Sequence, residues 1–341
     1  MGPGWGERSR VERGASRGYD FLETVFSKAS GVAVARDSEK PRDARCLADE
    51  SAAAAAARVL AARLGTVHDL LRGIAGGNDS EEAVHALRVA TRRAGAALDG
   101  FEPLLPARRA DWFQTHLKRL RRTAGKVRDL DSILDGLRSG DQGRKRPQRS
   151  PDVARAIAIV AKKRAKAGKA LGRAVDRFPG SKTWQARAHK LTAAIDRRDG
   201  APRFDHLGAE RLGAIVGRFF TAVADGAANT DALHAIRIRA KQARYAIEIF
   251  APTPSPPRQR SLATFEHLRD LAGRCIDQAT AAARFTRWAR RAEARADRKT
   301  FSMLAAAAAA AAETARRKAV AWFTPRRVSD FQRDVGRLQR A

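Results

Sequence analysis

Two stretches of the chain place a histidine and several basic residues at helical spacing. They are His85, Arg88 and Arg92 in the first stretch, and His234, Arg237, Lys241 and Arg244 in the second. Residues spaced in this way lie on neighbouring turns of one helix face. The arginine fork matches phosphate oxygens in pairs, whereas lysine acts as a mobile point charge. Like charges this close disfavour an isolated helix, so their presence in both stretches indicates an anionic ligand with repeated charges.

An apolar stripe runs one residue before each basic row, and it predicts the helices that position the rows. Its members are Val84, Leu87, Thr91, Ala94, Leu98 and Phe101, and then Leu233, Ile236, Ala240, Ala243, Ile247 and Phe250. Gaps of three and four residues put each stripe on one helix face. Asp79 or Ser80 would cap the first helix, and the run from Asn229 to Asp231 would start the second. Both histidines then lie within the first two turns, where unpaired N–H groups favour phosphate.

The similarity of the two stretches continues beyond them. Phe101 and Pro103 are matched by Phe250 and Pro252, and further on Ala124, Gly125 and Asp129 are matched by Ala272, Gly273 and Asp277. The same order of matches at nearly the same offset indicates a duplication of at least two helices. We therefore expect the two motif helices to be related by a pseudo-twofold axis.

Taken together, the motifs resemble the CHAD family, a histidine-containing α-helical domain. The resemblance rests on HALRVATRR from His85, LKRL from Leu117, VRDLD from Val127, the stretch from His234 to Glu248, and LRDLAGR from Leu268. It extends from residue 52 to the C-terminus. It implies an all-α fold, in which two pseudo-symmetric four-helix bundles form one domain around a basic central cavity. It also implies that this cavity binds inorganic polyphosphate, with possible association with polyphosphate granules.

The expected polyphosphate-binding residues combine the two rows with nearby basic positions. They are His85, Arg88, Arg92, Arg93, Lys118, Arg121, Arg122, Arg128, His234, Arg237, Lys241, Arg244 and Arg274. For those outside the rows, the competing interpretation is a solvated face or an ion pair with Asp129, Asp131 or Asp270. The copies also differ, because Gly95 stands where the second copy has Arg244 and Ile276 replaces the counterpart of Arg128. The cavity should therefore be asymmetric.

Two other classes of function remain open at this point. A nucleic-acid-binding protein would explain the charge equally well, but the chain has no zinc-finger spacing and few aromatic residues for stacking bases. An enzyme acting on phosphate chains would need an oriented base or a metal held by carboxylates. Asp129, Asp131 and Glu82 exist, although helix capping or pairing with arginine explains them. The sequence therefore favours a binding module with no catalytic residue, metal or cofactor.

Composition sets the broad class. The 341 residues carry a net charge of +30, and 44% of them are hydrophobic, many of these being alanine. Alanine-rich cores suit closely packed helices, and no alternating pattern indicates a sheet. Residues 1–50 are net neutral, so the whole excess of positive charge lies in residues 51–341. No apolar run is long enough to span a membrane. The absence of a secretory signal, together with free Cys46 and Cys275, predicts an intracellular, cytoplasmic protein.

The predicted organisation is a disordered tail followed by one domain. The tail covers 1–50 and includes Cys46, and the domain covers 51–341. Its first half is about 51–140, a linker is 139–151, and the second half is about 152–341 with the motif repeat at 233–297. Besides the two motif helices, the patterns predict helices at 51–74, 109–125, 128–137, 152–178, 181–198, 204–224, 258–273, 275–297, 299–321 and 326–340.

Overall fold

The computed structural model describes residues 46–142, 151–178, 180–197 and 200–338. Within these ranges the chain forms α-helices and one short 3-10 helix, with no β-strand, so the all-α prediction is confirmed. The first helices are α2 (Ala52–Ala75), α3 (Glu81–Gly100), α4 (Ala107–Gln142), α5 (Pro151–Asp176) and α6 (Ser181–Asp196). They are followed by α7 (Phe204–Ala224), α8 (Thr230–Phe250), α9 (Pro256–Arg290), α10 (Arg295–Val320) and α11 (Pro325–Leu338). The 3-10 helix η2 (Glu102–Leu104) joins α3 to α4.

The helices follow one another in two similar series. From α2 to α6 they have 24, 20, 36, 26 and 16 residues, and from α7 to α11 they have 21, 21, 35, 26 and 14. Three helices contact their own counterparts, since α2 packs on α7, α3 on α8 and α5 on α10. The segments before α2 and α7 also pair, through Ala52 N–H to the Pro202 carbonyl and Phe204 N–H to the Glu50 carbonyl. These contacts are the ones that a duplicated five-helix unit would make about a twofold axis.

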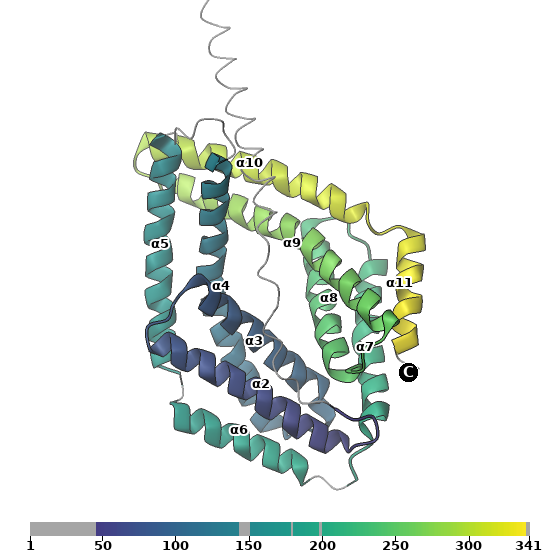
Figure 1. The fold of residues 1–341 in the computed structure, drawn as a ribbon. Helices are drawn as coiled ribbons and strands as arrows, with labels where there is room; N and C mark the ends of the chain where they lie inside the picture. Colours follow the sequence, from purple (N-terminus) through teal and green to yellow (C-terminus); the bar gives the residue numbers. More distant parts are fainter. Residues whose placement is uncertain (1–45, 143–150, 179, 198–199, 339–341) are drawn as a thin grey trace, which may run out of the picture.

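Two apolar cores, with a small third cluster of Leu233, Cys275 and Ala319, hold the described helices together. The larger core joins α2, α3, α6, α7, α8 and α11 with parts of α4, α5 and α9. The smaller core lies where the ends of α4 and α9 meet the starts of α5 and α10, in the upper left of Figure 1, around Leu137, Val160, Phe285 and Phe301. Because α4 and α9 each contribute side chains to both cores, these two long helices connect the cores.

Several predicted boundaries are wrong. The helices expected at 109–125 and 128–137 are one helix, α4, and those expected at 258–273 and 275–297 merge into α9, which ends at Arg290. The glycines at 125 and 273 do not break these helices, because a helical glycine costs only about 1 kcal/mol relative to alanine, which tertiary packing offsets. The other predicted helices have counterparts close to their expected bounds.

The linker and tail predictions need partial correction. Residues 139–142 of the predicted linker belong to α4, whereas 143–150 lie outside the described residues. Of the predicted tail, residues 1–45 also lie outside them. Cys46 is not in a loose tail but buried against the larger core, and burial raises the pKa of its thiol to about 11. Cys275 is buried in α9, and neither cysteine forms a disulfide.

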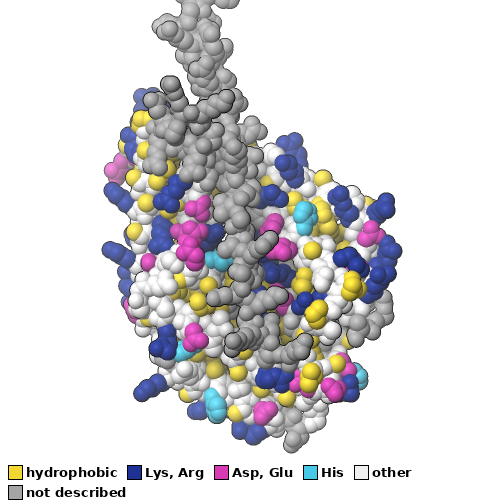
Figure 2. Space-filling view, in the orientation of Figure 1, with side chains coloured by type: hydrophobic (Ala, Val, Ile, Leu, Met, Phe, Trp, Pro, Cys, Tyr) yellow, Lys and Arg dark blue, Asp and Glu magenta, His cyan; other side chains and the backbone are white. Residues whose placement is uncertain are grey.

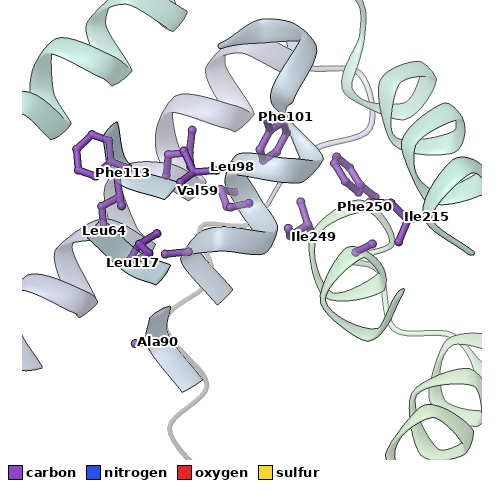
Figure 3. Close-up of a cluster of buried hydrophobic side chains, with 14 of the residues drawn as sticks. Val59, Leu64, Ala90, Leu98, Phe101, Phe113, Leu117, Ile215, Ile249 and Phe250 are labelled. Carbon is purple, nitrogen blue, oxygen red and sulfur yellow. The ribbon is translucent and has the colours of Figure 1, made fainter. Parts of the chain in front are cut away.

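The close approach of α3 and α8 depends on Gly100. A Cβ there would lie 2.9 Å from a Phe250 ring carbon, and that ring is held between Phe101, at 5.2 Å between centroids, and Phe204. Figure 3 shows Phe101 and Phe250 approaching each other across the two helices. The Phe250 ring therefore has little freedom to move away from an added methyl group.

We expect Gly100→Ala to lower the free energy of unfolding by about 1–3 kcal/mol, as overpacking does elsewhere. Gly217→Ala is the matched control, because Gly217 is an exposed helical glycine with nothing within 4 Å of its would-be Cβ. That control should be stabilising by about 0.4–1 kcal/mol. Urea denaturation of both variants checks the pair, and equal stability would show that the Phe250 ring yields at no cost.

Candidate functional site

The two motif helices begin as the sequence predicts. The Ser80 hydroxyl accepts a hydrogen bond from Ala83 N–H at 3.2 Å, and the Asn229 side chain accepts one from Ala232 N–H at 2.8 Å. His85 and His234 are each the fifth residue of their helix. Every member of both predicted apolar stripes is buried. The stripes therefore fix the rotation of α3 and α8, and with it the direction of the basic rows.

The two basic rows meet at the contact of α3 with α8. We call Arg88, Arg92, Arg237 and Lys241 the basic cluster. Burial, followed by the charge of Arg92, lowers the pKa of Arg88 to about 10. Burial, followed by Arg237 and then Arg92, lowers the pKa of Lys241 to about 6. The pKa of Lys241 on α8 responds to Arg92 and Arg88 of α3, and the lowered pKa of Arg92 responds to Arg237 of α8, so the duplicated rows share one location.

Two aspartates provide the nearest counter-charges. An Arg237 amino group donates to Asp277 of α9 at 3.2 Å, and Arg284 of α9 donates to Asp129 of α4 at 2.7 Å. Burial nevertheless raises the pKa of Asp129, and the cations around it, led by Arg284 and Arg88, only partly oppose that effect. Asp129 and Asp277 are matched positions of the duplication, so each half supplies one carboxylate to the cluster.

Some donors of the basic cluster have no partner. The Nε atoms of Arg88 and Arg237 are buried and make no hydrogen bond. The Arg237 guanidinium lies against Gly273 of α9, where a Cβ would be 3.3 Å from one of its amino nitrogens. Buried polar groups in native proteins usually have partners, so these two donors are candidates for contact with an anionic ligand, although buried atoms outside the cluster, such as the Ser261 hydroxyl, also make no hydrogen bond.

The halves differ at Gly95, as the sequence comparison suggested. A guanidinium nitrogen of Arg121 lies 3.7 Å from the position that a Cβ would take at Gly95. The second half has Arg244 at the matching position. Arg121 also acts electrostatically on Arg92. The first half therefore receives a cation from α4 where the second half carries one on its motif helix.

The other predicted binding residues lie outside the basic cluster. Arg93 and Arg244 both pair with Glu248, each at 3.4 Å, so this carboxylate joins α3 to α8. Arg128 pairs with Glu81 and lies 3.9 Å from Asp135. The remaining members with exposed side chains are Lys118, Arg122, His234 and Arg274.

The two histidines differ in their surroundings. His85 is partly buried, whereas His234 is exposed. Desolvation, followed by the charges of Arg237 and Lys241, lowers the pKa of His234. His234 is therefore electrostatically coupled to the cluster, although it lies at its edge.

Sequence reasoning named Asp129 as an alternative ion-pair partner of the basic residues but missed the other counter-ions of the site. Asp277 was matched to Asp129 as part of the duplication, but it was not expected to pair with an arginine. Glu248 lies inside the second motif, but one of its two partners, Arg93, is on α3 and the other, Arg244, is on α8. The motif by itself therefore did not reveal that Glu248 links the two helices. The residue of the first half that aligns with Arg284 is Gly136. The repeat therefore gave no indication that Arg284 belongs to the site.

Two further observations concern metal sites and membrane-spanning helices. Among the described residues no group of three or more His, Cys, Asp or Glu side chains is arranged to hold a metal ion. No helix in the same part of the chain is long and apolar enough to cross a membrane. Figure 2 shows many Lys and Arg side chains around the rim of the visible face, with acidic side chains at several places among them. This face therefore carries many basic side chains outside the cluster as well.

Comparisons with known proteins agree with this architecture. A family profile described as "CHAD domain" matches residues 58–286. The crystal structure of the CHAD domain from the plant Ricinus communis is similar, with a TM-score of 0.61 and 19% identity over 87% of this chain and 97% of that one. PptA from Streptomyces chartreusis is similar as well, with a TM-score of 0.57 and 20% identity over 79% of this chain and 98% of that one. No curated protein matches the chain.

Proposed function

Because the chain belongs to the CHAD domain family, we propose that it binds inorganic polyphosphate at the basic cluster and performs no chemistry on it. The observation that carries the proposal is the meeting of two duplicated rows, with buried Arg88 and Arg237 donors that lack partners. Each half contributes two cations to one location. A ligand with many closely spaced negative charges matches this arrangement better than a single phosphate does.

The counter-ions favour binding over catalysis. Phosphoryl transfer usually relies on carboxylates that hold a metal ion. Here Asp277 accepts from Arg237, and Asp129 accepts from Arg284. Both carboxylates therefore neutralise part of the arginine charge. This reduces the repulsion between the cations when no anion is bound. In the cytoplasm such binding would bring the protein to polyphosphate granules.

A nucleic-acid-binding function is the second candidate, and the basic surface favours it (Figure 2). The aromatic side chain coupled to the basic cluster is Tyr245, which acts on Arg92. Tyr245 is 7% exposed, so it offers little face on which a base could stack. Polyphosphate needs no stacking surface and therefore suits the site better.

The test is a competition experiment at fixed salt with fluorescently labelled long polyphosphate. Unlabelled long polyphosphate should displace the label at lower phosphate concentration than DNA, RNA or ATP does. Equal displacement by DNA would favour the nucleic-acid function instead. In the same samples, phosphate release with Mg²⁺ or Mn²⁺ should stay at the level of a protein-free control. Release that disappears in His85→Ala would show that the protein is an enzyme.

A further inference from the structure

The ion pair between Arg237 and Asp277 joins a mostly buried side chain to an exposed one. Nη1 of Arg237 donates to Oδ1 of Asp277 at 3.2 Å. The Arg237 side chain is 19% exposed, whereas the Asp277 side chain is 60% exposed. The bond uses one amino nitrogen of the guanidinium group, and the buried Nε makes no hydrogen bond. The carboxylate can therefore turn into solvent while the guanidinium group stays where it is.

Packing against α9 holds the Arg237 guanidinium group independently of this bond. A Cβ at Gly273 would lie 3.3 Å from Nη2 of Arg237 and 3.6 Å from its Cζ and Nε. The guanidinium group thus rests on bare backbone, one helical turn before Asp277. Leu233 of α8 and Cys275 of α9 also share a small apolar cluster, so the two helices pack together near the pair without its help. Loss of the carboxylate should therefore leave Arg237 in position.

The charge of Asp277 also reaches the rest of the basic cluster. It opposes the lowering of the pKa of Arg88, Arg92 and Lys241. An anion that approaches these cations meets the same charge with the opposite effect, because like charges repel. Asp277 therefore competes with an anionic ligand for Arg237 and repels it at the other three positions.

The matched residue of the first half, Asp129, has a different partner. It accepts a hydrogen bond at 2.7 Å from Arg284 of α9, which does not belong to the basic cluster. Its side chain is also less exposed than that of Asp277. The duplication thus supplies two aspartates, of which Asp277 is the one that is hydrogen-bonded to an arginine of the cluster.

We propose that Asp277 is a built-in competitor of the ligand, because its carboxylate occupies Arg237 in the free protein and a phosphate group of the polyanion displaces it. The inference deepens the proposed function and rests on it, since it concerns the same cluster. Displacement exchanges one anion for another at Arg237. A chain that also contacts Arg88 and Arg92 gains the attraction needed to drive the exchange. The carboxylate therefore weakens the site and pairs with its arginine again when the ligand leaves.

The experiment compares wild type with Asp277→Asn in the full chain by isothermal titration with long polyphosphate. The amide keeps the size of the carboxylate and removes its charge, so binding should tighten about three- to tenfold at low salt. The gain should shrink as the salt concentration rises, because charges this close to solvent are screened. Melting curves of both proteins check that the variant is folded.

Further variants separate the charge of Asp277 from its shape. Asp277→Ala should tighten binding as Asp277→Asn does, whereas Asp277→Glu should not, because it keeps the charge. Asp176→Asn is the matched control, since Asp176 is exposed at the end of α5 and is not among the groups that act on Arg88, Arg92 or Lys241. This control should change affinity by less than about twofold, the effect of a slightly altered general field.

The possible outcomes distinguish the inference from the proposed function. Unchanged or weaker binding in Asp277→Asn would overturn the inference, because the carboxylate would then position Arg237 or lie outside the path of the ligand. Equal tightening in Asp176→Asn would overturn it as well, since any lost negative charge would then have the same effect. In both cases saturable binding by wild type would leave the proposed function intact. Absence of saturable binding by wild type would remove the proposed function itself.

Discussion

Replacing Arg88 and Arg237 together by alanine should weaken polyphosphate binding at least about thirtyfold at fixed salt. Each change removes a charged hydrogen-bond donor, at a cost of about 1–3 kcal/mol, so the pair should cost about 2 kcal/mol or more. Both guanidinium groups have a buried Nε without a partner, and they come from different halves of the duplication. Isothermal titration of the double variant measures the loss.

The matched control removes the same charge elsewhere. Arg122 of α4 and Arg274 of α9 were also predicted to bind, but both are exposed and neither is among the cations that act on Lys241. The double variant Arg122→Ala with Arg274→Ala should therefore lose only a few-fold in affinity, the effect of a weaker general field. Equal losses in the two double variants would mean that diffuse surface charge binds the ligand. Melting curves of all variants separate a lost contact from a lost fold.

Raising the salt concentration from 50 to 200 mM should weaken wild-type binding about a hundredfold. The basic cluster and Arg121 supply five cations to the site, while Arg128, which also acts on Arg88, is paired with Glu81. If each neutralises one phosphate, the single-strand slope of about −0.7 per contact gives a slope of about −3.5 in log K against log salt. A fourfold rise in salt then lowers affinity by roughly two orders of magnitude.

The slope also tests how many residues take part. The Arg88→Ala and Arg237→Ala double variant should have a slope shallower by about 1.4, because two contacts are gone. The Arg122→Ala and Arg274→Ala variant should keep the wild-type slope. A wild-type slope near −9, corresponding to about thirteen contacts, would instead indicate that all the basic residues predicted from the sequence bind phosphate. Titrations at four or more salt concentrations distinguish these cases.

The sequence predicted the helices and the direction of their faces well, because these depend on local periodicity. All twelve stripe residues are buried, and Ser80 and Asn229 cap their helices as expected. The continuity of α4 and α9 was missed for a physical reason. Gly125 and Gly273 weaken a helix only locally, while the packing of residues on both sides of them in two cores holds each helix together. That packing is not visible in a local pattern.

The candidate site could be predicted only in part. The basic rows were identifiable because the chain repeats them, and the meeting of α3 with α8 follows from their paired stripes. The sequence could not show which arginines join the basic cluster and which form ion pairs outside it. Arg93 of α3 and Arg244 of α8 pair with the same carboxylate, Glu248, and this contact depends on how the two helices pack. The low pKa of Lys241 also arises from cations on two helices, so no single stretch of sequence contains its cause.

The contacts of α2 with α7, α3 with α8 and α5 with α10 suggest a history for this chain. If a single five-helix unit were a separate polypeptide, each of these contacts would join identical helices of two copies across a symmetry axis. This is the isologous interface typical of a homodimer. A single five-helix unit would have assembled the proposed binding site only on dimerisation, with one basic row from each subunit. Fusion of the two genes would then have freed each copy to diverge, so that Arg121 of α4 lies beside Gly95 in the first half, whereas the second half has Arg244 at the matching position of α8.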